Sequence, residues 1–380
     1  MFLITKIKDC FNKIRKTVFF FNKNQIQSKE NYISFNSFEK VSIKPQIKGG
    51  CIKKKIIYQN RKKILQKLLN LFKTEFPQLP FIKIGVELEF YFYDFKSGKK
   101  YSKNFIEKKY KQIFNKIFDE CKKKNIQLDS YSTEMGENQF EIQTIPYTDI
   151  DKLAKDIEQL KQIIKVLVKE KDVVVDFNTK PFYTDSSNSM QINLSFADEE
   201  ENNLFRRIKD GYGGFIETQK LLYSVGGLCK TMNGLLLLIV NKEKDFSKYD
   251  KEANIILHKK GKIPAPTFVT WGIENRTAAI RISNSFKNLK DYNDENLDKK
   301  RRIEYRLPSP NSDIYMVLIS VLTGIYHGLK NKINPPEKTS FNVFDFKEEE
   351  GHEKLVTNMQ DAEKKFKELS QNLDLNFLFF

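Results

Sequence analysis

The sequence predicts an α+β domain whose sheet has an acidic polar face. Long segments with apolar residues at helical spacing are mixed with short segments in which apolar and polar residues alternate strictly. The polar faces of four such strands contain Glu, Gln, Asn and Arg but no Lys, although the chain contains 66 Lys and Arg residues. Ordinary half-buried strands would be expected to carry Lys on a solvated face, so we expect these faces to meet at a polar site.

The elements follow in order from periodicity and from the residues that end them. Asn60–Phe76 is predicted to be an amphipathic helix that ends at Pro77. The remaining predicted elements are a strand at 82–93, helix 103–125, strand 138–144, helix 149–171, strands 172–177 and 190–196, a largely helical stretch 200–245, strands 277–283 and 302–307, and helices 314–330 and 346–370.

Charge and composition divide the chain into three predicted parts. Residues 1–80 contain 18 Lys and Arg but only 4 Asp and Glu, whereas the other residues contain 48 and 45. We therefore expect a basic N-terminal extension at 1–80, a catalytic domain at 81–345 and a charged C-terminal helix and tail at 346–380. Because the net charge of +17 comes mainly from the extension, it does not indicate a specific nucleic-acid partner.

Cysteine usage and hydropathy favour a cytoplasmic protein. The four cysteines are scattered and form no CxxC pair, which is typical of free thiols in a reducing compartment. No apolar run approaches the ~20 residues of a membrane span. Lys and Arg interrupt the apolar start of the chain, which argues against a secretory signal.

The alternating strands place particular side chains together. In Ile84–Phe90, Glu87 and Glu89 share one face because side chains alternate along a strand. Like charges side by side are unfavourable unless a cation lies between them. Carboxylate and amide oxygens bind hard divalent cations, and Arg binds phosphate and carboxylate. The other polar faces are Gln139/Glu141/Gln143, Gln191/Asn193/Ser195 and Arg302/Glu304/Arg306.

These segments resemble, in order, the motifs of the glutamine synthetase catalytic domain. Its E-x-E strand is similar to GVELEFYFYD, and its R-x-E-x-R motif is similar to RIEYRLPSPNSDIY. Glu134–Glu141 is similar to the motif E-x-G-P-G-Q-x-E, and Lys180-Pro181 followed by Ser187–Ser195 is similar to K-P followed by G-S-G-M-H-x-H-x-S. The family's A-P, W, N-R and following Arg correspond to Ala265-Pro266, Trp271, Asn275-Arg276 and Arg281. Each motif alone is weak, and their common order makes the resemblance specific.

The resemblance implies a curved antiparallel half-barrel sheet, lined by acidic residues, with helices outside. It implies an ATP-dependent carboxylate–amine ligase acting through a γ-glutamyl-phosphate type intermediate, with Mg²⁺ or Mn²⁺ at two sites, a small amino-acid or amine substrate and a homo-oligomeric assembly. Implied metal ligands are Glu89, Glu134, Glu141 and Gln191 at one site and Glu87 and Glu304 at the second. Implied nucleotide-binding residues are Arg276, Arg281, Arg302, Asn193 and Ser195, and Arg276 and Arg306 are implied to be catalytic.

The departures from the family pattern cluster in the half that binds ammonium and glutamate. Gln191 and Asn193 replace the two histidines, which is expected to weaken one metal site. Ser187 and Ser189 replace glycines, and Pro264 replaces the acid of the flap that helps to deprotonate ammonium. Residues 1–80 do not resemble the small N-terminal β-grasp domain of the family.

Three hypotheses remain open from the sequence. The first is an ATP-dependent ligase of glutamine biosynthesis and nitrogen metabolism. The second is a catalytically impaired or inactive relative that binds nucleotide or acts as an interaction protein. The third gives the function to the basic N-terminal segment, which would bind RNA or an anionic membrane in a salt-sensitive way.

Overall fold

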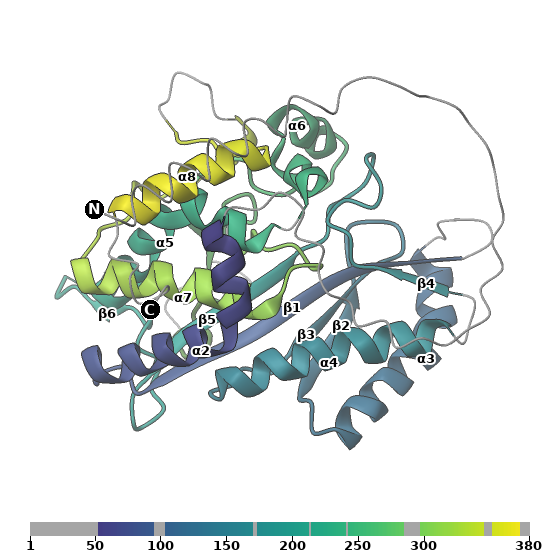
Figure 1. Ribbon diagram of the computed structural model, residues 1–380, viewed down its shortest axis with the longest axis horizontal. Coiled ribbons are helices and arrows are strands. Elements are labelled where there is room, and N and C mark those ends of the chain that lie inside the picture. The colour runs from purple at the N-terminus through teal and green to yellow at the C-terminus, as the bar shows by residue number, and fades with distance from the viewer. Residues whose placement is uncertain are drawn as a thin grey trace. The chain divides into compact units, whose positions relative to one another are not determined.

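An open, partly curved sheet organises the core, as the computed structural model shows (Figure 1). The structure describes residues 52–94, 103–169, 173–212, 214–240, 242–284, 297–345 and 352–372. Most of the predicted basic extension therefore lies outside the described residues. Its last part forms helix α2 (Ile52–Glu75), which contributes Leu65, Leu68 and Phe72 to the main core.

The sheet contains eight of the described strands. Their order is β2 (Leu128–Thr133), β3 (Gln139–Thr144), β1 (Phe81–Asp94), β5 (Met190–Ala197), β10 (Arg302–Tyr305), β9 (Ile280–Ser283) and β8 (Trp271–Ile273), and β4 (Val173–Asp176) also pairs with β1. All described pairs are antiparallel except the parallel pair β8–β9. The predicted α+β class with an antiparallel, unclosed sheet is confirmed.

Strand register brings the predicted polar residues onto one face. Glu87 on β1 lies opposite Gln191 on β5, and Glu89 lies opposite Glu141 on β3. Glu304 on β10 lies opposite Asn193 on β5. Residues directly opposite one another in an antiparallel pair project to the same side of the sheet. The apolar residues between them therefore face the helices on the other side.

Helices α2, α3 (Lys103–Lys123) and α4 (Ile150–Lys169) cover this apolar face (Figure 1). Phe72 of α2 contacts Phe196 of β5 at 6.0 Å between ring centroids. Phe114 of α3 packs on Phe90 and Phe92 of β1. Because the aromatic side chains fill the helical side of the sheet, the polar face is left to form the site.

Helix α5 (Gln219–Ile239) packs between α7 (Ile314–Asn331) and α8 (Met359–Asn372) (Figure 1). A Cβ atom at Gly227 would lie 2.1 Å from the carbonyl oxygen of Gly324, so glycine permits the close crossing of α5 and α7. Among the described helices, α5 alone is long and apolar enough to cross a membrane, and 83% of its apolar window is buried inside the protein. That burial is typical of a central core helix.

The prediction of a largely helical stretch at 200–245 was wrong in part. Its first half contains the hairpin strands β6 (Ile208–Lys209) and β7 (Phe215–Ile216), because Gly211 turns the chain with a φ of +83°. The short helix α6 (Lys251–Lys259) and the 3-10 helices Glu243–Tyr249, Leu297–Lys300 and Val343–Asp345 complete the described elements. Of the helix predicted at 346–370, residues 346–351 lie outside the described part, and α8 begins at Met359.

Candidate active site

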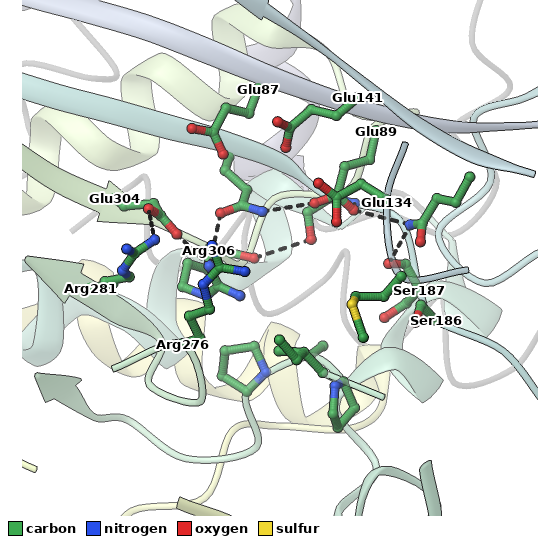
Figure 2. A pocket seen from close by; sticks show the side chains of 18 of the residues that line it. Glu87, Glu89, Glu134, Glu141, Ser186, Ser187, Arg276, Arg281, Glu304 and Arg306 are labelled. Atoms are coloured by element: carbon green, nitrogen blue, oxygen red, sulfur yellow. Dashed lines mark hydrogen bonds and ion pairs between the residues drawn. The ribbon is translucent and has the colours of Figure 1, made fainter. Parts of the chain in front are cut away.

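A cavity of about 400 Å³ lies against the polar face of the sheet (Figure 2). It is lined by residues from the six strands β1, β2, β3, β5, β9 and β10, by the loops around Met135 and Ser187, and by the irregular segment after α6. Ten of the predicted site residues line it together: Glu87, Glu89, Glu134, Glu141, Gln191, Glu304, Arg276, Arg281, Arg302 and Arg306. Figure 2 shows Glu87, Glu89, Glu134 and Glu141 near one another, and Glu304 beside Arg281 and Arg306.

Glu89 is buried at the centre of the acidic group. Its carboxylate accepts hydrogen bonds from the Ser189 backbone N–H at 2.8 Å, from Gln191 Nε2 at 2.7 Å and from Gln139 Nε2 at 3.3 Å. Burial, and then repulsion from Glu134, raise the pKa of Glu89 to about 8, because both disfavour the charged form. The three hydrogen bonds to Glu89 offset only part of the free-energy cost of its charged form.

The pKa values of the neighbouring carboxyl groups are raised for the same reasons. Burial, followed by repulsion from Glu87 and Glu89, raises the pKa of Glu141 to about 10. Burial and the charge of Glu304 raise the pKa of Glu87. The acidic group thus holds more negative charge than its surroundings compensate, which a divalent cation would relieve.

The donor set fits a hard cation. Carboxylate oxygens on several strands are the ligands that Mg²⁺ and Mn²⁺ prefer. Across the described ranges, no three His, Cys, Asp or Glu side chains are grouped closely enough to hold an ion as they stand. The carboxylate oxygens of the acidic group accept hydrogen bonds from amide and guanidinium donors instead. Cation binding would therefore require these hydrogen bonds to break.

Glu304 differs from the other acids because two arginines flank it. Arg281 Nη1 lies 3.0 Å from one carboxylate oxygen, and Arg306 contacts the other. Burial alone would raise the pKa of Glu304, but the charges of Arg306 and Arg281 outweigh it, and the pKa is lowered. Glu304 is therefore a fixed anion that orients both guanidinium groups towards the cavity.

Arg302 and Arg276 line other parts of the cavity, and the two remaining predicted residues, Asn193 and Ser195, are outside its lining. Arg302 donates from Nε to Asn193 Oδ1 at 2.6 Å, and Asn193 Nδ2 donates to Glu87 at 2.9 Å. Arg276 is exposed where it lines the cavity. Ser195 lies further along β5, opposite Lys83, and is outside the cavity lining. The structure therefore does not bring Ser195 together with the other predicted residues.

An apolar strap, defined here as Lys262–Pro266, crosses the cavity opposite the acids. Ile263, Pro264, Ala265 and Pro266 line the cavity, so the strap places no acidic side chain there. Asn254 holds it from α6 by donating to the Ala265 carbonyl at 2.9 Å. Lys262 Nζ donates to the Met135 carbonyl at 2.8 Å and lies 3.2 Å from Asp185.

Sequence reasoning missed Lys248, which is fully buried behind the acids. Its ammonium donates to Ser189 Oγ at 2.8 Å and to the carbonyls of Asn188 and Leu307 at 3.2 Å each. Burial lowers the pKa of Lys248 to about 7, against the attraction of Glu89, which raises it. Its burial depends on the 3-10 helix after α5, and nothing in its sequence context separates it from the many surface lysines.

Comparison with known proteins identifies the family of the chain. Residues 62–374 match the family model described as glutamine synthetase, catalytic domain. The glutamine synthetase of Sulfolobus acidocaldarius is 25% identical over 217 residues, which cover 56% of this chain and 40% of that protein. The glutamine synthetase of Pyrococcus horikoshii is 28% identical over 236 residues, which cover 60% of this chain and 46% of that protein. The chain thus spans less than half the length of these curated relatives.

Solved structures show the same fold. A GmaS–ADP complex superposes with a TM-score of 0.67 at 17% identity, covering 84% of this chain and 70% of that chain. Plasmodium falciparum glutamine synthetase gives a TM-score of 0.63 at 18% identity, covering 84% and 73%. Since the family model matches most of its length, this chain belongs to the glutamine synthetase catalytic-domain family.

Proposed function

We propose that the protein is an ATP-dependent carboxylate–amine ligase. The single observation that supports this most is the cavity in which six predicted cation-site residues and four arginines meet. Phosphoryl transfer to a carboxylate brings two anions together, so positive charge and positioning supply most of the catalysis. The reaction would serve glutamine biosynthesis or a related branch of cytoplasmic nitrogen metabolism.

The proposed reaction has two balanced steps. A substrate carboxylate oxygen attacks the γ-phosphorus of ATP, the bond to the ADP oxygen breaks, and an acyl phosphate forms. An amine nitrogen then attacks the acyl carbon, the carbon–oxygen bond to phosphate breaks, and the amine loses a proton. The products are ADP, phosphate and an amide.

The chain's own residues have separable tasks in this scheme. Two Mg²⁺ or Mn²⁺ ions, held by Glu89, Glu134 and Glu141 and by Glu87 and Glu304, would neutralise phosphate charge when bound. Arg276, Arg281 and Arg302 would bind phosphate oxygens. Arg306 would orient the acyl phosphate or the substrate carboxylate. Its buried Nε has no hydrogen-bond partner among the described residues, which leaves a donor for such an anion.

A specific observation also favours an impaired enzyme. The strap places Pro264 at the cavity where the family motif has an acid, and proline cannot accept a proton from ammonium. We therefore propose weak turnover with ammonia and better use of an amine that reaches the site unprotonated. A protein that binds nucleotide without turnover is the second candidate function.

The test is ATP-dependent amide formation by the full chain. ADP release and amide product are measured with Mg²⁺ and Mn²⁺ across a panel of amino acids combined with ammonia or small amines, beside calorimetric binding of ADP. We expect nucleotide binding, and amide formation with at least one acid–amine pair. Binding of ADP without product from any pair would favour the second candidate, and absence of both would refute the proposal.

A further inference from the structure

Two side-chain amides on β5 each join an arginine to a glutamate of β1, one arginine lying on β10 and the other directly after it. Arg306 Nη1 donates to Gln191 Oε1 at 3.1 Å, and Gln191 Nε2 donates to Glu89 Oε1 at 2.7 Å. One pleat further along, Asn193 makes the equivalent link between Arg302 and Glu87 at 2.6 and 2.9 Å. The two Arg–amide–Glu relays run side by side across three neighbouring strands.

Chemistry fixes the orientation of both amides. A guanidinium only donates hydrogen bonds, so the amide oxygen must face the arginine, and the amide nitrogen is then left to face the glutamate. Turning Gln191 to present its oxygen to a cation beside Glu89 would set its N–H groups against Arg306. The structure therefore opposes a direct ligand role for Gln191.

A third contact of the same kind supports this reading independently. Lys248 Nζ donates to Ser189 Oγ, and the Ser189 backbone N–H donates to Glu89 Oε2. Ser189, Gln191 and Asn193 occupy alternate positions, so their side chains project on one side of the sheet. Each lies between a basic side chain and an acid of β1.

We propose that Gln191 and Asn193 are positioning residues that hold the acids of β1 by hydrogen bonds, and that a divalent cation binds only by displacing their amide donors. This rests on the proposed function, because it takes Glu87 and Glu89 as cation ligands. The consequence is a site that assembles without metal and binds metal more weakly than its number of carboxylates suggests.

The test compares Mn²⁺ binding by the full chain and by matched variants, with free Mn²⁺ measured by electron paramagnetic resonance. Gln191→Met removes the amide but keeps the side-chain length, and Asn193→Leu does the same in the second relay. Gln162→Met makes the same chemical change on the exposed surface of α4 and serves as the control. Circular dichroism confirms folding, and Asn193→Leu carries the test if Gln191→Met does not fold.

The sign of the change decides the result. If Mn²⁺ must displace the amide donor, it should bind Gln191→Met roughly threefold to tenfold more tightly than the unchanged protein, since a hydrogen bond to a charged group no longer has to break. A ligand role predicts weaker binding, so weaker or unchanged affinity overturns the inference. A merely structural role would lower the melting temperature without tightening binding, which also overturns it. If Gln191→Met binds Mn²⁺ more tightly but the unchanged protein forms no amide product in the ligase assay, the inference is supported and the proposed ligase activity is refuted.

Discussion

The two walls of the cavity are built in different ways. The sheet wall carries Glu87, Glu89 and Glu304 on regular strands, and register fixes their neighbours. The strap has no regular secondary structure and depends on a few contacts from Asn254 and Lys262. The charged wall keeps the carboxylates and arginines that we propose bind metal and phosphate, although Gln191 and Asn193 replace the two histidines of the motif, whereas the strap has Pro264 where the family motif has an acid. We therefore expect changes in the strap to alter the amine step of the proposed reaction without disturbing the core.

The sheet wall should show the largest effect of a single change. Glu304→Gln removes the anion between Arg281 and Arg306, so the largely buried guanidinium group of Arg306 loses this ion pair, whereas Arg281 keeps its pair with Glu274. We expect the free energy of unfolding to fall by about 3 kcal/mol, because breaking one side of a buried pair is costly. Urea unfolding followed by circular dichroism measures this, and nucleotide binding should be lost as well. A decrease below about 1 kcal/mol would show that the arginines do not depend on Glu304.

The strap should instead respond in turnover. Pro264→Glu places a carboxylate at the cavity opposite the acids, where it is positioned to accept the proton that an ammonium loses. Removal of a positioned base typically costs ~10²–10⁴-fold, so we expect a gain of roughly tenfold to a hundredfold in ammonia-dependent amide formation. Ile263→Glu is the matched control, because it adds the same charge one residue away. Equal gains in both variants would indicate a general charge effect.

The acidic group should also make the metal-free protein less stable as pH rises. The pKa of Glu89 is raised from 4.5 to about 8 and that of Glu141 to about 10, so both stay protonated in the folded chain at pH values where the unfolded chain releases these protons. The unfolded state then binds fewer protons, and the free energy of unfolding falls with rising pH.

This effect is best measured between pH 5 and pH 7 in the presence of a chelator. Above about 7, Lys248 acts in the opposite direction, because its lowered pKa releases a proton in the folded chain that the unfolded chain keeps. The expected slope is at most about 1.4 kcal/mol per pH unit for each carboxyl. Glu89→Gln should reduce it, and an equal slope in that variant would contradict the assignment.

The sequence predicted the sheet wall better than the strap for a physical reason. Strict alternation determines which side chains share a face, so Glu87 with Glu89 and Arg302 with Glu304 were placed together from the sequence, and the strand register brings these pairs onto one polar face. Lys248 was missed because tertiary packing alone buries it. Gln191 was interpreted as a possible ligand because the sequence does not contain the position of Arg306, which holds its oxygen. Contacts between distant segments in irregular backbone leave no periodic pattern.

The smallest expected effect concerns the contacts that hold the strap. Lys262 joins it to Met135 and Asp185, and the Lys262 side chain is 25% exposed while that of Asp185 is 3% exposed. Partial exposure screens the ion pair, so Lys262→Met should change the free energy of unfolding by less than about 1 kcal/mol. The strap itself should open more often, because only Asn254 at Ala265 and the Lys262 backbone N–H at the Leu257 carbonyl, of the hydrogen bonds described here, would then hold it. We expect faster amide hydrogen exchange confined to residues 261–266 and a KM raised a few-fold, with little change in the sheet.

Lys251→Met, in the same region but on α6, is the control. Faster exchange that spreads into β1 or β5 would show that the two walls are coupled, and the contrast between them would then be wrong.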